Sequence, residues 1–179
     1  MMRNHKKNKR KGSGMTPGMM ITRCPYCGSP VVIRSADGIY KENKNDAKLY
    51  VCSKYPICDA YVRIQPGTDN IPIGSMANGE LRALRIKAHR YFDCIHQSGL
   101  LTKRDAYAWL ANAICAPMSH AHIGQLSDYY CRVVIEESKQ FLWNNRDRLA
   151  KMNYSIAELL PDDAGGDFYA TGQYAKAAG

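Results

Sequence analysis

The chain has 179 residues, of which 45% are apolar, and carries a formal net charge of +9. This length and apolar content suffice for one ordinary domain or two small ones with packed cores. The sequence contains no run of eighteen apolar residues and no short apolar segment behind its basic N-terminus. It therefore predicts neither a membrane span nor a signal peptide, and we expect a globular, cytoplasmic protein.

Both ends of the chain differ in composition from its centre. Residues 1–20 carry six lysines and arginines and no acidic residue, and residues 161–179 are rich in glycine and alanine. Segments with so little apolar surface to bury are typically disordered. The basic segment could contact phosphates nonspecifically or act only as a solubilising tail. We expect a disordered basic tail at 1–20 and a flexible C-terminal tail at 161–179.

Residues 21–66 have the pattern of a small antiparallel sheet. The runs 31–33 and 49–51 are β-prone, and residues 60–64 alternate between apolar and polar side chains. The polar segment 36–48 predicts a hairpin loop between the first two strands. A turn-rich stretch at 65–70 separates this region from the rest of the chain, and we expect a domain boundary near residue 70.

Beyond residue 70, apolar residues recur at helical spacing in three stretches, at about 78–97, 102–116 and 127–148. Asn78 or Ser75 can cap the first of these helices. Thr102, with Asp105 three residues later, resembles the capping box that begins a helix. The sequence thus predicts a three-helix domain over residues 70–150.

Four cysteines form two pairs in the first region. Cys24 and Cys27 are separated by two residues, which lets both sulfurs converge on one ion, and Gly28 tolerates the tight turn that follows. Cys52 and Cys58 are separated by five residues, after a segment long enough to fold back as a hairpin. Four thiolates satisfy the tetrahedral preference of zinc at about 2.3 Å and leave no open coordination position. We therefore predict one structural Zn²⁺ per chain.

Two other uses of these cysteines are an iron–sulfur cluster and an unligated redox pair, and both explain the second pair less well. The chain has seven cysteines, an odd count that argues against a disulfide framework. A segment of about forty residues has too small a core to fold without its metal. The predicted fold class is α+β: a four-cysteine zinc ribbon at 21–66, built from antiparallel hairpins, followed by the three-helix domain.

The two cysteine elements resemble a known type of ribbon. Cys24-Pro25-Tyr26-Cys27-Gly28 followed by Cys52-Ser53-Lys54-Tyr55-Pro56-Ile57-Cys58 is similar to the C-terminal zinc ribbons of type IA DNA topoisomerases, over about forty residues. Those ribbons bind DNA, often as single strands, so the resemblance implies the same for this segment. The loop between the pairs is longer here than is usual there.

A second resemblance is broader. The order of the ribbon, then Pro72-Ile73-Gly74, Leu81-Arg82-Ala83-Leu84-Arg85, His89 and the segment 106–111 resembles a bacterial and phage family of zinc-finger-containing proteins. This likeness spans roughly residues 22–143. The family has no assigned function, so the resemblance implies no catalytic residues.

Basic and aromatic residues alternate around the cysteines, as a surface that stacks bases and contacts phosphates would require. On the first helix, several polar residues fall beside the apolar face and could form a phosphate-facing ridge. The same tyrosines could instead cover a small core, and any amphipathic helix has a polar flank. The candidate nucleic-acid-binding residues are Arg23, Tyr26, Arg34, Lys54, Tyr55, Arg63, Arg82, Arg85 and His89.

The remaining histidines and cysteines have weaker patterns. His120 and His122, with His89 and Asp93, could form a second metal site, which would make the protein a metal-dependent nuclease. We expect the three remaining cysteines to be buried small hydrophobes in helices: Cys94, Cys115 and Cys131. The sequence contains no Walker loop, dinucleotide-binding turn, nucleophile elbow or paired-carboxylate motif, so we do not expect an enzyme.

The sequence therefore favours a zinc-binding accessory protein of bacterial or phage origin that binds nucleic acid, with DNA preferred over RNA and either single strands or duplex as the partner. The alternative is a zinc-ribbon adaptor or inhibitor that docks on the proteins of replication, transcription or other nucleic-acid machinery. A nuclease using His89, Asp93 and His120 ranks below both.

Overall fold

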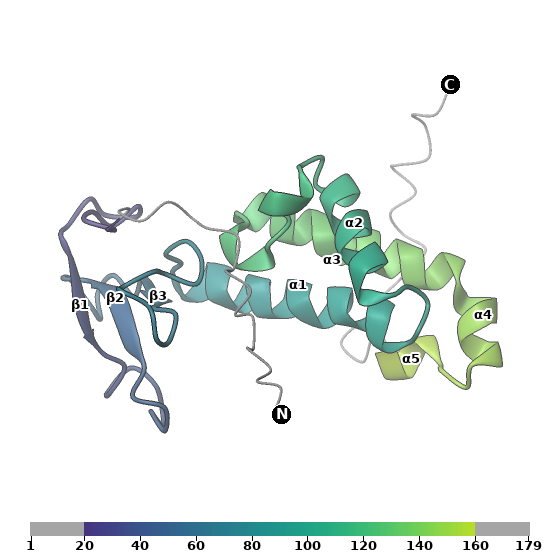
Figure 1. Ribbon diagram of the computed structural model, residues 1–179, viewed down its shortest axis with the longest axis horizontal. Helices are drawn as coiled ribbons and strands as arrows, with labels where there is room; N and C mark the ends of the chain where they lie inside the picture. Colours follow the sequence, from purple (N-terminus) through teal and green to yellow (C-terminus); the bar gives the residue numbers. More distant parts are fainter. Residues whose placement is uncertain (1–19, 160–179) are drawn as a thin grey trace, which may run out of the picture. The chain divides into compact units, whose positions relative to one another are not determined.

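The computed structural model describes residues 20–159, and the chain folds as two units, the first ending at Met76 and the second beginning at Ala77 (Figure 1). The predicted C-terminal tail, and the predicted basic tail except for Met20, lie outside the described residues. Within residues 20–159, no helix combines the length and the apolar content that a membrane crossing requires.

The first unit contains a three-stranded antiparallel sheet in the order β1-β2-β3 (Figure 1). The strands are β1 (Val31–Ser35), β2 (Lys48–Cys52) and β3 (Tyr61–Arg63). As predicted, residues 36–47 connect the first two strands, and the Ala36 N–H donates to the Ala47 carbonyl across the base of this loop. The central strand β2 is almost entirely buried because it has a neighbour on both sides.

Each face of the sheet buries its own small cluster, because side chains alternate along a strand. Tyr50 and Cys52 project to one face and pack with Cys24 and Met76. Leu49 and Val51 project to the opposite face. There they pack against two alanines of the connecting loop, Ala36 and Ala47. The cysteine cluster therefore lies on the first face only.

The second unit is helical. Its elements are α1 (Gly79–Gln97), α2 (Lys103–Ala113), the 3₁₀ turns η1 (Met118–His120) and η2 (Ile123–Gln125), α3 (Asp128–Asn144), α4 (Arg146–Lys151) and α5 (Ile156–Leu159). Together with the sheet, these helices confirm the α+β class.

The predicted capping residues begin the first two helices. The Asn78 side chain accepts the Leu81 N–H, so Asn78 rather than Ser75 is the N-cap of α1. The Thr102 hydroxyl oxygen accepts a hydrogen bond from the Asp105 N–H. The Thr102 hydroxyl also donates to the Asp105 carboxylate at 2.7 Å. Both side chains satisfy backbone donors that a helix leaves unpaired in its first turn.

The number of helices differs from the sequence prediction. The third helix was expected to run to Arg148, but α3 ends at Asn144 and α4 begins at Arg146, so the described residues contain five helices instead of three. Asn145 explains the break: its side-chain amide donates to the Phe141 carbonyl at 2.9 Å. The backbone of Asn145 leaves the helical conformation, at φ −104 and ψ 13, and asparagine favours helix ends because its side chain bonds nearby backbone groups.

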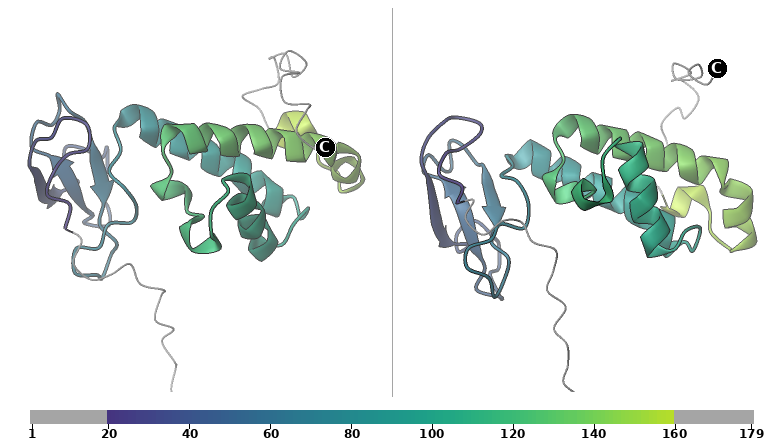
Figure 2. Two further views of the ribbon diagram at one scale, coloured as in Figure 1. Left: turned by 90° about the horizontal axis from the view of Figure 1, so that it is seen from above. Right: turned by 45° about the horizontal axis from the view of Figure 1, so that its top comes forward.

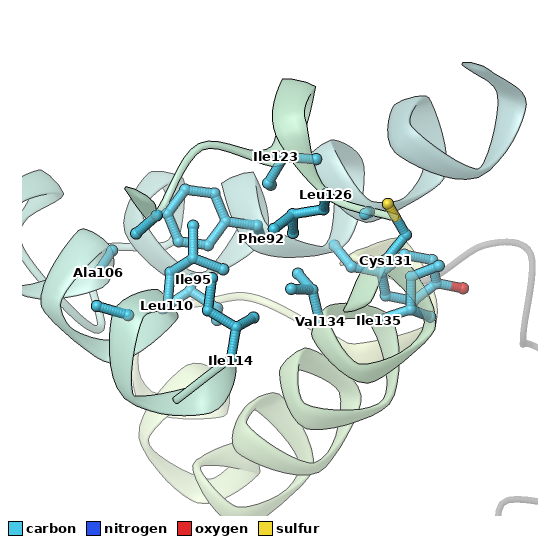
Figure 3. Close-up of a cluster of buried hydrophobic side chains, with 14 of the residues drawn as sticks. Phe92, Ile95, Ala106, Leu110, Ile114, Ile123, Leu126, Cys131, Val134 and Ile135 are labelled. Carbon is cyan, nitrogen blue, oxygen red and sulfur yellow. The ribbon is translucent and has the colours of Figure 1, made fainter. Parts of the chain in front are cut away.

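The core of the second unit lies where α1, α2 and α3 meet. Helices α1 and α3 run alongside each other in both views of Figure 2, and they form the most extensive contact in the unit. Phe92 and Ile95 of α1 meet Leu110 of α2 and Val134 of α3 in the cluster of Figure 3. The apolar stripes that the sequence predicted for these helices therefore bury against one another.

Candidate metal centre

The first metal knuckle is held by two backbone hydrogen bonds. The Gly28 N–H donates to the Cys24 carbonyl, and the Cys24 N–H donates to the Ser29 carbonyl, both at 2.9 Å. Gly28 adopts φ +69, a conformation that glycine reaches without steric cost. This turn brings Cys24 and Cys27 to the same side of the chain.

The second knuckle begins at the end of β2. The Cys52 N–H donates to the Ala60 carbonyl, which fixes this residue in the sheet, and the Cys58 N–H donates to the Lys54 carbonyl, which curls the five intervening residues. The Ser53 N–H also donates to the carbonyl of Pro30, the residue just before β1. This bond joins the second knuckle to the segment that follows the first one.

The four sulfur atoms lie in the geometry of a single metal site. All four Sγ atoms are within 4.8 Å of one another. The Cys24 and Cys58 sulfurs are 3.6 Å apart, and the Cys27 and Cys52 sulfurs are 3.4 Å apart. A tetrahedron with zinc–sulfur bonds of about 2.3 Å has sulfur–sulfur edges of about 3.8 Å. The cluster therefore fits one structural Zn²⁺ ion, as predicted.

The surroundings of the thiols make their protonation unequal. The hydroxyl and then the backbone N–H of Ser29, followed by the Cys52 thiol, lower the pKa of Cys27 to about 6. Burial raises the pKa of Cys52 to about 12. The Ala60 N–H lowers the pKa of Cys58, but burial and the Cys24 and Cys27 thiols outweigh it and raise this pKa overall. Sequence reasoning missed Ser29, because no spacing rule marks a serine two residues after a ligand.

These pKa shifts predict how zinc binding depends on pH. At pH 7 Cys27 is already a thiolate, whereas Cys52 and Cys58 are protonated, and zinc binds only thiolates. Zinc binding should therefore release the protons of Cys52 and Cys58. Each released proton strengthens the apparent zinc affinity about tenfold per pH unit as pH rises.

Proton release can be measured by calorimetric zinc titration in buffers with different ionisation enthalpies. A chain that releases no protons on binding zinc at pH 7 would contradict this assignment. The sign also predicts a steeper pH dependence in acid: below the pKa of Cys27 this thiol is protonated too, so zinc binding must displace one more proton.

A closed four-cysteine site on a small antiparallel sheet defines a zinc-finger type of metal-binding protein. The chain belongs to a family described as a zinc-finger-containing domain, whose model matches residues 20–141. No curated protein and no solved structure matches the chain. These comparisons show neither the resemblance to topoisomerase ribbons nor a phage origin.

The predicted nucleic-acid residues of the first unit lie in two places. Arg23 and Tyr26 are exposed on the first knuckle, where Arg23 Nη1 donates to the Gly28 carbonyl at 3.2 Å. Lys54 is exposed and Tyr55 is half-buried on the second knuckle, and the Arg34 guanidinium carbon lies 5.8 Å from the centre of the Tyr55 ring.

The sheet register brings Arg34 and Arg63 to one face. Arg34 of β1 and Arg63 of β3 are both cross-strand neighbours of Leu49. Direct neighbours across antiparallel strands project to the same face, so both arginines lie on the face opposite the cysteine cluster. Tyr40, Tyr55 and Tyr61 pack against the apolar cluster of that same face. We call this set the Arg–Tyr face.

The candidates on α1 do not form one exposed ridge. Arg85 is buried, and its Nε and Nη2 donate to the Leu126 carbonyl at 3.0 and 2.8 Å, so it ties the loop before α3 to α1. Arg82 Nη1 donates to the Ala77 carbonyl and is partly buried. His89 is exposed.

The proposed second metal site does not form. Across residues 20–159, the four cysteines are the one group of three or more histidine, cysteine or acidic side chains with ligand atoms close enough to share an ion. The described positions of His89, Asp93, His120 and His122 therefore give no support to a catalytic metal.

The three cysteines outside the metal centre differ from one another. Cys131 is fully buried and Cys94 is partly buried, but the expectation that Cys115 is buried is wrong, because it is exposed. It lies beyond the end of α2 with φ +51. Pro117 indicates in the sequence that the helix ends before Cys115, since residues just before a proline tend to leave the helical conformation.

Proposed function

We propose that this protein is a zinc-binding, nucleic-acid-binding accessory protein, with DNA as the favoured partner. The observation that carries the proposal is the Arg–Tyr face, where Arg34 and Arg63 flank an apolar centre surrounded by three tyrosines. Zinc has a structural role in this proposal, because four protein ligands leave no position for a substrate or water. We assign the protein no catalytic step.

The chemistry of the Arg–Tyr face suits a nucleic acid. Arginines contact phosphates and also stack on bases, and tyrosine rings stack on bases that are not paired within a duplex. The arginine–tyrosine contact between Arg34 and Tyr55 presents both kinds of surface at one place. Lys54, on the adjacent knuckle, adds an exposed cation beside it.

Binding of labelled single-stranded and duplex oligonucleotides by the zinc-loaded protein, measured across salt concentrations, tests this function. We expect binding that weakens steeply with salt, because phosphate contacts release counterions. A matched chain without residues 1–19 separates the basic N-terminal segment from the ribbon. If neither chain binds any oligonucleotide at low salt, the proposal fails.

Replacement of Tyr55 by Ala tests the stacking surface. We expect a loss of about 1–3 kcal/mol in single-strand binding, the range for one base on one aromatic ring. The zinc content should be unchanged. Since Tyr55 also packs against the buried cluster of the Arg–Tyr face, thermal unfolding of the variant must be measured as well. A joint loss of stability and binding would identify Tyr55 as a packing residue instead.

Lys54→Ala is the matched control on the same knuckle. Because Lys54 is exposed and offers no ring, its replacement should weaken binding modestly and flatten the salt slope by about one unit. If both variants bind oligonucleotides as well as the parent chain does, the knuckle is not part of the interface.

A protein adaptor is the second candidate, and one observation favours it. Ile57 is 93% exposed at the tip of the second knuckle, and Tyr26 is 44% exposed on the first. Exposed apolar side chains on a turn are suited to a pocket on another protein. Ile57→Ser should then abolish capture of a partner protein from the nucleic-acid machinery while leaving oligonucleotide binding unchanged.

A further inference from the structure

A cavity of about 430 Å³ lies in the second unit, between the end of α2 and the first turn of α3. Its volume is within the range that small-molecule sites occupy. The cavity is lined by Ile114, Cys115, Ala116, His120, Gln125, Leu126, Ser127 and Tyr130. It contains no zinc ligand and no residue of the Arg–Tyr face, so it belongs to neither site described above.

The lining combines an apolar part with chemically active side chains. Ile114 and Leu126 are buried and supply the apolar part. Cys115 is an exposed thiol, and His120 is an exposed imidazole that lines the same cavity. Cysteine and histidine together are the residue types of an activated thiol, since the imidazole can accept the thiol proton.

Cys115 differs in accessibility from the other cysteines. All seven cysteines of the chain lie in the described residues, and four of them form the metal centre. Cys131 is fully buried, and the Cys94 thiol is directed at the carbonyls of Arg90 and Leu159, at 3.1 and 3.4 Å. In the zinc-loaded protein, Cys115 is therefore the thiol that a small molecule reaches most easily.

We propose that this cavity is a modification site, in which Cys115 exchanges with small disulfide molecules. His120 accepts the Cys115 proton, and the thiolate attacks one sulfur of the disulfide. A new sulfur–sulfur bond forms to Cys115 and the bond within the disulfide breaks. The departing thiolate takes the proton back from His120 and leaves as a thiol, so the small disulfide is the oxidant and Cys115 is oxidised.

The lining also indicates which disulfides fit. His120, Gln125, Ser127 and Tyr130 all carry hydrogen-bond donors, and no carboxylate lines the cavity. Asp128 lies next to Ser127 in the chain but is not part of the lining. The site therefore favours disulfides that carry carboxylates, such as oxidised glutathione, over disulfides whose charged groups are amines alone, such as cystamine.

The test is the reaction of the zinc-loaded full chain with oxidised glutathione and, separately, with cystamine. Peptide mass spectrometry identifies the modified cysteine and its rate of modification. We expect modification at Cys115, absent in Cys115→Ser, with zinc retained and with oxidised glutathione preferred. His120→Gln should slow the reaction about tenfold or more, because the thiol loses its proton acceptor. The control is His122→Gln, since His122 is also exposed but does not line the cavity.

Two results would overturn the proposal. The first is the absence of modification at Cys115 while the zinc remains bound. The second is a modification rate at Cys115 that is the same in the parent and His120→Gln chains and is no faster than in the chemically unfolded chain. Cys115 would then be an ordinary exposed thiol. Circular dichroism of each variant establishes that the helices are intact, so that a change in rate reports on the cavity.

Discussion

Replacing Cys27 by Ser is expected to remove zinc from the protein and unfold the first unit. Structural zinc contributes about 10–16 kcal/mol of apparent binding free energy in small zinc domains, and there this energy is folding free energy. Without zinc, the first unit is held together only by a three-stranded sheet and two small buried clusters, which contribute little stability compared with the metal. Elemental analysis should find no zinc, and the amide protons of β2 should lose their protection from exchange.

Cys115→Ser is the matched control, because it removes another exposed thiol that does not belong to the cluster. This variant should keep one zinc ion per chain and the same exchange protection in β2. A Cys27→Ser chain that kept both its metal and its sheet would show that Cys27 is not a required ligand. The finding of iron in place of zinc in the parent chain would likewise contradict the proposed centre.

Replacing Phe92 by Ala is expected to lower the stability of the second unit by about 3–5 kcal/mol. Phe92 is 1% exposed, and its ring centre lies 5.2 Å from that of Tyr107 in an edge-to-face contact. The substitution leaves a cavity in the cluster shown in Figure 3 and removes these ring contacts. Denaturant unfolding followed by helical circular dichroism measures the loss.

Ile86→Ala is the control on the same helix. Ile86 is 64% exposed, so its truncation should change stability by about 0.5 kcal/mol or less. The measurement should also be repeated after a chelator has removed the zinc. Since the core of the second unit contains no metal ligand, we expect the same loss with and without zinc. If the helical signal disappears with the metal, the two units depend on a shared core.

The sequence by itself was enough to predict the metal centre and most of the elements. Two residues between Cys24 and Cys27 restrict their sulfurs to one side of a turn, whatever the rest of the chain does. Thr102 and Asp105 begin α2 through contacts within a single helical turn. Local rules of this kind need no knowledge of distant residues, which explains why they succeeded here. The break at Asn145 was missed because helical periodicity continues across it.

The tertiary structure alone decided what the polar and reactive side chains face. Arg85 has the spacing of a surface residue on α1, but it is buried because the carbonyl of Leu126, forty-one positions away, accepts two of its hydrogen bonds. Arg34 and Arg63 meet on one face through the register of strands on either side of β2. Cys115 and Tyr130 share a cavity because the chain between α2 and α3 folds back on itself. In each case the surroundings of the side chain depend on contacts between residues far apart in the chain. A local sequence pattern carries no information about such contacts.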